Sequence, residues 1–136
     1  MTKAHLIAFA VLALSFLAMD ALWLGIISTG FYQQAIGHLL APKPDFIAAA
    51  AFYLIYLAGT FYFAVWPAFR DGKIKTALLS GAFFGFVAYA TYDLTNAATL
   101  KDWPLSMTII DLIWGTVLTG TCAGISAWSG FKFRSR

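Results

Sequence analysis

Four long apolar runs occupy most of this 136-residue chain and restrict what it can fold into. They extend over about residues 4–28, 46–69, 76–99 and 105–129, and each approaches the ~20 residues that a helix needs to cross a bilayer. Hydrophobic residues make up 61% of the chain and charged residues only 11%, a composition at which a soluble domain would aggregate. The sequence therefore predicts an all-α integral membrane protein, with four transmembrane helices forming one bundle over residues 1–136.

The basic residues predict the orientation of this bundle, because cytoplasmic loops carry an excess of lysine and arginine. Most of them belong to the two termini and to the loop between the second and third runs: Lys3, Arg70, Lys73, Lys75, Lys132, Arg134 and Arg136. Only Lys43 and Lys101 lie on the other side, so both termini are expected in the cytoplasm. The net charge of +3 fits this topology and the lipid head groups, and it gives no reason to propose nucleic acid as a partner.

The linker between the first two runs has a pattern of its own. Its segment FYQQAIGHLL, residues 31–40, carries apolar side chains at helical spacing. This pattern favours a short amphipathic helix across the outer mouth of the bundle, ended by Pro42 and Pro44. We interpret His38 as a solvated loop histidine.

Three aspartates interrupt the apolar runs: Asp20 in MDALWLG, Asp93 in YDLTNAA and Asp111 in IIDLIWG. An ionisable group inside a span costs roughly 2.5–3.5 kcal/mol, so it normally faces the bundle interior and often marks a site. The alternating direction of the helices puts all three roughly 5–9 Å to the outer side of the midplane, at ~1.5 Å per residue. We therefore expect a polar layer in the outer leaflet.

Helical spacing adds further hydrogen-bonding groups to this layer, since residues three and four apart share a face. The candidate binding residues are Asp20, Asp93, Asp111, Asn96, Tyr89, Tyr53, Tyr56, Trp23 and Trp114. No basic side chain is expected at that depth, so either protons or a cation must balance the carboxylates. A cage of the three aspartates would suit a hard divalent cation as metal ligand, whereas zinc would need clustered histidine and cysteine.

Small residues dominate the inner half of the last two runs, where Gly81 and Gly85 face Gly120 and Gly124 in the predicted antiparallel pair. This spacing allows the backbones of two helices to approach closely. The bundle is therefore predicted to be tight at its cytoplasmic end and polar at its outer end.

Two segments echo each other. Asp20 and Asp111 are each followed three residues later by a tryptophan and then by a nearby glycine. The echo would relate helices of opposite direction, as inverted repeats do in transporters. A duplication and chance similarity are the two interpretations.

These motifs also resemble those of a known family. Residues 92–100 (YDLTNAATL), the Trp103-Pro104 pair, Asp111 with WGT at 114–116, and DALWLG at 20–25 are similar to recurring features of family 2177 of the domains of unknown function. Its members are small, predicted four-span bacterial membrane proteins. The resemblance covers essentially the whole chain and implies the bacterial inner (cytoplasmic) membrane, but it supplies no reaction.

Three classes of function remain open. A binding site in the acidic layer would take a cation, a proton or a small amphiphilic, lipid-like ligand. In a structural or accessory subunit of a membrane complex, the layer would only fix helix packing. The assemblies considered are a homodimer and a larger membrane complex. A small membrane enzyme would use the aspartates as acid, base or metal ligands on a lipid-borne substrate, although HExxH, GxSxG and Ser-His-Asp patterns are missing. The sequence favours the binding site and leaves enzymatic activity undecided.

Overall fold

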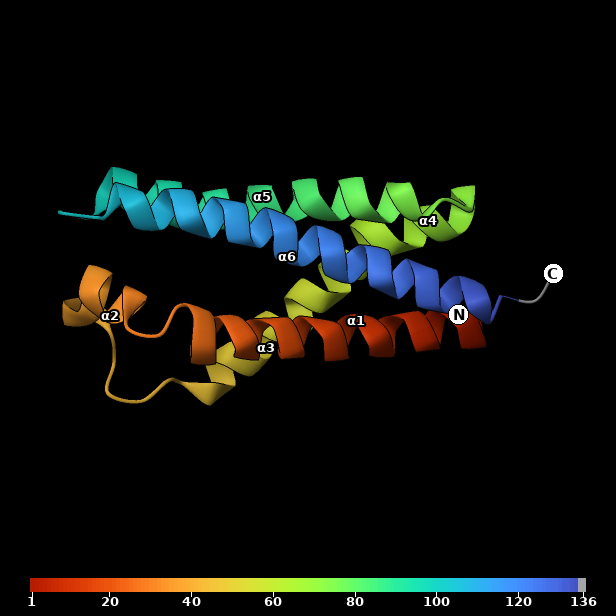
Figure 1. Ribbon diagram of the computed structural model, residues 1–136, viewed down its shortest axis with the longest axis horizontal. Coiled ribbons are helices and arrows are strands. Elements are labelled where there is room, and N and C mark those ends of the chain that lie inside the picture. Colours follow the sequence, from red (N-terminus) through yellow and green to blue (C-terminus); the bar gives the residue numbers. More distant parts are fainter. Residues whose placement is uncertain (135–136) are drawn as a thin grey trace.

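The computed structural model describes residues 1–134 as a bundle of helices joined by short connections (Figure 1). Four helical stretches are long and apolar enough to cross a membrane: Lys3–Ile27, Phe46–Asp71, Ile74–Thr99 and Leu105–Lys132. Their bounds lie within a few residues of the predicted ones, and no strand occurs in the part of the chain that is described. The predicted all-α architecture with four membrane-spanning helices is therefore confirmed.

The first two spans are each widened by a turn of π-helix. The first consists of α1 (Lys3–Leu22) and the π-helical η1 (Trp23–Ile27). The second consists of α3 (Phe46–Thr60), the π-helical η3 (Phe61–Val65) and α4 (Trp66–Asp71). In the second span the cause is Pro67, which has no N–H to donate and whose ring would clash with the carbonyl four residues earlier in a regular α-helix.

The last two spans, α5 (Ile74–Thr99) and α6 (Leu105–Lys132), are uninterrupted α-helices. Between the first two spans lies α2 (Phe31–Ile36), followed by a single 3₁₀ turn, η2 (Gly37–Leu39). The predicted short helix is therefore present, and Ile36 is its buried residue. It stops before Pro42.

The start of α1 and the end of α6 lie at the same end of the bundle as the α4–α5 turn (Figure 1). We call this the inner end, and the end that carries α2 and the α5–α6 turn the outer end. That the inner end is cytoplasmic stays a prediction. Arg136, one of the basic residues behind it, lies outside the described residues.

Glycines allow α5 and α6 to pack closely against each other. A Cβ added at Gly85 would lie 2.1 Å from the Gly115 carbonyl oxygen, and one at Gly81 would lie 2.7 Å from the Ala123 Cβ. The predicted close approach of these two helices is therefore confirmed. It also extends further outward than expected, because Gly115 leaves room for the ring of Tyr89, whose atoms would be 2.3 Å from a Cβ there.

α6 is the central helix of the bundle. Half of its most apolar stretch is buried, against 17–22% for the other three spans. On the side away from α5 it packs on α1, where Ser126 Oγ donates a hydrogen bond of 2.7 Å to the Ala8 carbonyl oxygen. A helix buried on two sides tolerates few large residues, which explains its many glycines, alanines and serines.

α3 runs obliquely to the other spans (Figure 1), and its first turns stand away from the bundle. Phe46 and Ile47 are 76% and 86% exposed, whereas Tyr56 and Leu57 are buried. The outer parts of α3 and α5 are therefore separated, and this separation shapes the candidate site described below.

The start of α3 gives a first testable prediction. Asp45 caps this helix, because its Oδ1 accepts hydrogen bonds of 3.0 Å from the backbone N–H groups of Ile47 and Ala48. Asp45→Ala should lower the free energy of unfolding by about 1 kcal/mol, whereas Asp45→Ser should retain most of the stability. Thermal unfolding in a non-ionic detergent, followed by circular dichroism, measures both variants. Equal losses would contradict the capping role.

Candidate functional site

The predicted polar layer lies in the outer half of the bundle, but its three aspartates do not form one cluster. Asp93 on α5 lies next to Asp111 on α6, whereas Asp20 on α1 faces α3. Within residues 1–134, no three His, Cys, Asp or Glu side chains are close enough to hold a metal ion together. The expected metal cage of Asp20, Asp93 and Asp111 is therefore not formed, because Asp20 is turned toward a different neighbouring helix.

Asp93 is the most unusual residue of the layer. Its side chain is completely buried. Asp111, Thr108 and Trp103 surround the carboxyl group, yet neither Oδ1 nor Oδ2 has a hydrogen-bond partner among the described residues. The Thr108 hydroxyl accepts a hydrogen bond of 3.0 Å from Trp103 Nε1, which leaves its own proton available to donate. A buried carboxyl group without partners costs stability, so it requires an explanation.

Asp111 is also buried but is well bonded. The Tyr32 hydroxyl of α2 donates to its Oδ1 at 2.6 Å, and Trp23 Nε1 donates to the Tyr32 oxygen at 3.0 Å. Burial, and then the hydrogen bond to Asp111, raise the pKa of the Tyr32 hydroxyl above its ordinary value, so it stays protonated and continues to donate near neutral pH. These two hydrogen bonds hold α2 over the outer side of Asp93 and Asp111.

The two tryptophans of the sequence echo meet face to face. The rings of Trp23 and Trp114 are stacked, with centroids 4.4 Å apart and planes inclined by 10°. Trp114 Nε1 is buried and has no hydrogen-bond partner within the described part of the chain. The echo thus corresponds to a real contact between antiparallel helices, while its origin by duplication stays a hypothesis.

Asp20 forms a separate pair. It is half-buried and accepts a short hydrogen bond from the Tyr53 hydroxyl of α3. Both aspartates of the echo are therefore bonded to a tyrosine of a neighbouring element.

The remaining predicted residues divide into near and distant ones. Tyr89 packs its ring on Gly115, and Asp20 and Asp111 are among the charged groups around its hydroxyl. Tyr56 instead shares a hydrogen bond of 2.8 Å with Thr119 of α6. Asn96 is half-buried near the end of α5, and no hydrogen bond of its side chain to the aspartates is observed in residues 1–134.

A groove of about 320 Å³ lies between α3 and α5, where these helices diverge. Its lining is aromatic and apolar: Phe52, Tyr56, Ala88, Tyr89 and Tyr92. Tyr89 belongs both to this lining and to the surroundings of the aspartates. Tyr89 therefore connects the apolar groove with Asp20 and Asp111, and Asp93 is not among the groups that act on it within the described residues.

The sequence reasoning missed Tyr32, Thr108 and Trp103 as parts of the site. Tyr32 belongs to the predicted amphipathic helix, and a hydroxyl on a segment expected over an acidic layer was a usable signal. Trp103 was considered only as part of the Trp103-Pro104 motif, but it is half-buried and donates a hydrogen bond to Thr108.

Tyr32→Phe tests the fastening of α2. The variant loses the hydrogen bonds to Asp111 and from Trp23, so the amides of residues 28–40 should exchange hydrogen faster, by roughly 10-fold or more for a loss of about 1.5–3 kcal/mol. Hydrogen exchange measured by mass spectrometry gives this rate. Gln34→Ala, on the exposed face of the same helix, is the control. Equal protection in wild type and Tyr32→Phe would show that these bonds do not hold α2.

Comparison with known proteins supports the resemblance seen in the motifs. A family model described as "Predicted membrane protein (DUF2177)" matches residues 5–128. The matched part includes the three aspartates, Tyr32 and both stacked tryptophans. No curated protein and no solved structure matches the chain.

Proposed function

The chain belongs to this DUF2177 family of predicted membrane proteins, and from the site in its outer half we propose that it binds a small amphiphilic molecule with a cationic head group. The observation that carries the proposal is the completely buried carboxyl group of Asp93, without a hydrogen-bond partner in the described chain and beside Asp111.

The head group follows from charge and hydrogen bonding. Two adjacent buried carboxyl groups cannot both stay ionised without a compensating charge, and no Lys, Arg or His is among the groups that act on Asp93 in the described chain. An ammonium group would supply one positive charge and up to three N–H donors to the unbonded oxygens. Calcium and magnesium fit less well, because they require about six oxygen ligands and the third aspartate is engaged elsewhere.

The apolar part of the ligand follows from the groove. At about 320 Å³, it is at the small end of the range for ligand pockets, which suits one short chain. Phe52, on its α3 side, is 48% exposed on the surface that a bilayer would cover. We therefore propose entry from the membrane between α3 and α5, with the head group moving past Tyr89 toward Asp93.

A proton is the second candidate for the same site. When no cationic ligand is bound, a proton shared between Asp93 and Asp111 would balance their charge. Proton and ammonium would then compete for the carboxyl group of Asp93, so the amphiphile should bind more weakly at low pH.

The binding experiment uses the full chain in nanodiscs of phosphatidylcholine and compares four probes with the same twelve-carbon chain: dodecylamine, dodecyltrimethylammonium, dodecanol and dodecyl sulfate. Dodecylamine should raise the melting temperature most, because it alone combines charge with N–H donors. Asp93→Asn should abolish this shift. Asp102→Asn should keep it, because Asp102 is exposed at a positive φ, where asparagine is well tolerated.

Two outcomes would contradict the proposal. If dodecanol stabilises as much as dodecylamine, the head group is not recognised by the acids. If Asp93→Asn responds like wild type, the amine acts elsewhere. A parallel series with magnesium, calcium and chelator tests the metal alternative directly, and a metal-dependent shift that disappears in Asp93→Asn would replace the amphiphile proposal.

A further inference from the structure

A second cavity lies at the inner end of the bundle, remote from the acidic layer. It has a volume of about 410 Å³ and is formed by the start of α1, by α4 and by the residues that follow α6. Its lining residues are Thr2, Lys3, Ala4, His5, Trp66, Phe69, Arg70, Phe133 and Arg134. We propose that this cavity binds a phosphate group, presented either by the head group of an anionic phospholipid or by a soluble phosphate compound.

The charge of the lining is the first argument. Lys3, Arg70 and Arg134 come from distant parts of the sequence and are brought to one cavity by the fold, and no acidic residue is among the described residues that line it. The carboxylate of Asp71 does not line the cavity, and it accepts hydrogen bonds from Thr76 and from the backbone of Lys73 at the α4–α5 turn. Two guanidinium groups provide the planar, forked donors that suit phosphate oxygens.

His5 adds a neutral donor with a defined tautomer. The backbone N–H of Thr2 donates to His5 Nδ1 at 3.3 Å, and the Thr2 hydroxyl contacts the same atom at 2.7 Å. Because a backbone N–H can only donate, Nδ1 is the acceptor and the ring proton of the neutral form is on Nε2. Stacking on Phe69, with centroids 4.4 Å apart, holds the ring in the cavity wall.

The backbone N–H groups at the start of α1 also favour binding of an anion. Thr2, Lys3 and Ala4 line the cavity at the first turn of a 20-residue helix, where N–H groups lack partners within the helix and the helix dipole favours an anion. Together with the cationic side chains, these groups surround the cavity with donors from two sides.

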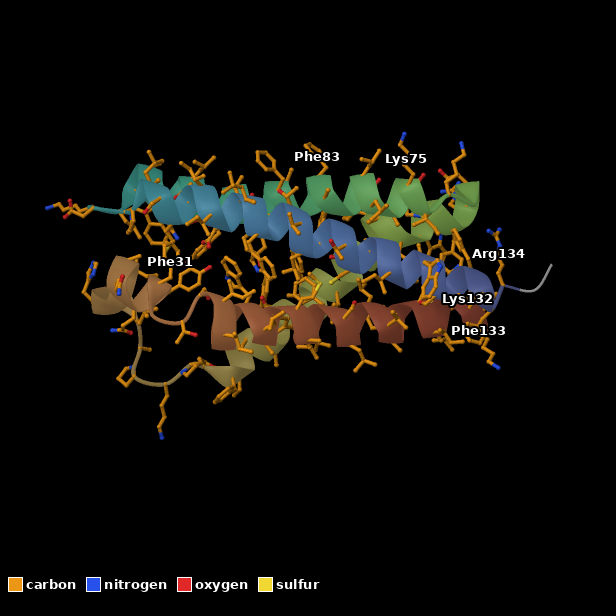
Figure 2. The ribbon with its side chains drawn as sticks, viewed as in Figure 1. Phe31, Lys75, Phe83, Lys132, Phe133 and Arg134 are labelled. Atoms are coloured by element: carbon orange, nitrogen blue, oxygen red, sulfur yellow. The ribbon has the colours of Figure 1, made fainter. Side chains whose placement is uncertain are left out.

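The position of the cavity also fits a lipid head group. Trp66 lines it and is 38% exposed, as expected for a tryptophan at a membrane interface. Phe69 and Phe133 provide apolar wall beside the charges. Figure 2 shows Phe133 and Arg134 at the inner end near the start of α1, whereas Lys75 points away from the bundle.

Lys73 and Lys75 supply a matched control, because they lie at the same end of the bundle but do not line the cavity. We would compare Arg70→Gln/Arg134→Gln with Lys73→Gln/Lys75→Gln, which removes the same charge. The full chain in a non-ionic detergent is titrated with phosphatidylglycerol and read by native mass spectrometry. The arginine pair should bind it about 30-fold more weakly than wild type, while the lysine pair changes little.

The source of the phosphate is decided by competition. If inorganic phosphate displaces phosphatidylglycerol at a similar concentration, the site binds soluble phosphates. If phosphatidylglycerol is not displaced, the site binds the lipid. Equal weakening by the two pairs overturns the proposal, because the inner end would then act as a diffuse positive surface. Unchanged binding by the arginine pair overturns it as well. If that pair does not fold, Arg70→Lys and Arg134→Lys replace it, and weaker binding with the charge retained still supports a forked phosphate contact.

Discussion

Gly85→Ala is expected to lower the free energy of unfolding by about 3 kcal/mol, the upper end of the usual cost of overpacking. The new Cβ would lie 2.1 Å from the Gly115 carbonyl oxygen and 2.6 Å from Thr119 Oγ1, and a backbone atom cannot move aside as a flexible side chain can. α5 and α6 would have to separate along their whole contact. Thermal unfolding in detergent and elution on size exclusion measure the loss.

Gly25→Ala is the matched control for this substitution. A Cβ at Gly25 meets no atom within 4 Å, so the variant should be as stable as wild type or slightly more stable. If Gly85→Ala and Gly25→Ala melt together, the close approach of α5 and α6 is wrong. In that case the position of Asp93 relative to Asp111 would also have to be revised, because these two helices carry them.

Asp93→Asn is expected to change stability in the opposite direction, raising the free energy of unfolding of the ligand-free protein by about 1–3 kcal/mol. The substitution removes a buried group that can be charged, and the new amide can donate to the neighbouring Asp111 carboxylate. Thermal unfolding in non-ionic detergent measures the change. The gain should shrink at low pH, where the wild-type carboxyl groups are protonated as well.

Asp20→Asn provides the comparison for this result. Asp20 already accepts a hydrogen bond from Tyr53, and an amide oxygen is a weaker acceptor than a carboxylate, so this variant should lose stability slightly. A gain at position 93 together with a loss at position 20 would show that Asp93 is retained at a cost to stability. Comparable losses at both positions would favour the accessory-subunit reading, in which the polar layer only fixes helix packing.

Much of the candidate site was predictable because polar and ionisable residues are rare within apolar membrane spans and therefore stand out in the sequence. An aspartate in an apolar run normally turns inward, so the sequence predicted that Asp20, Asp93 and Asp111 face the bundle interior, while their depth in the bilayer stays a prediction. The partner of each acid did not follow, since it depends on the rotation of each helix about its own axis. Asp20 on α1 is bonded to Tyr53, whereas Asp93 on α5 lies beside Asp111.

The two tyrosines of the second span show the same limit. Tyr53 and Tyr56 are three residues apart and were predicted to share the polar layer, but only Tyr53 bonds an aspartate while Tyr56 bonds Thr119. The oblique course of α3 causes this difference, because its outer turns stand away from the bundle and its later turns are packed into it (Figure 1). The crossing angle of two helices results from the packing of their surfaces, so the sequence of one helix alone does not predict it.

The four spans, the short helix of the first linker and the glycines between α5 and α6 were predictable from the amino-acid pattern alone. These features depend on length, hydropathy and side-chain size, which are local properties. Three features were not predictable in this way: the hydrogen bond from Tyr32 to Asp111, the unbonded carboxyl group of Asp93 in the described chain, and the shared cavity of Arg70 and Arg134. Each of these depends on contacts between residues far apart in the chain, which form only when the helices have packed.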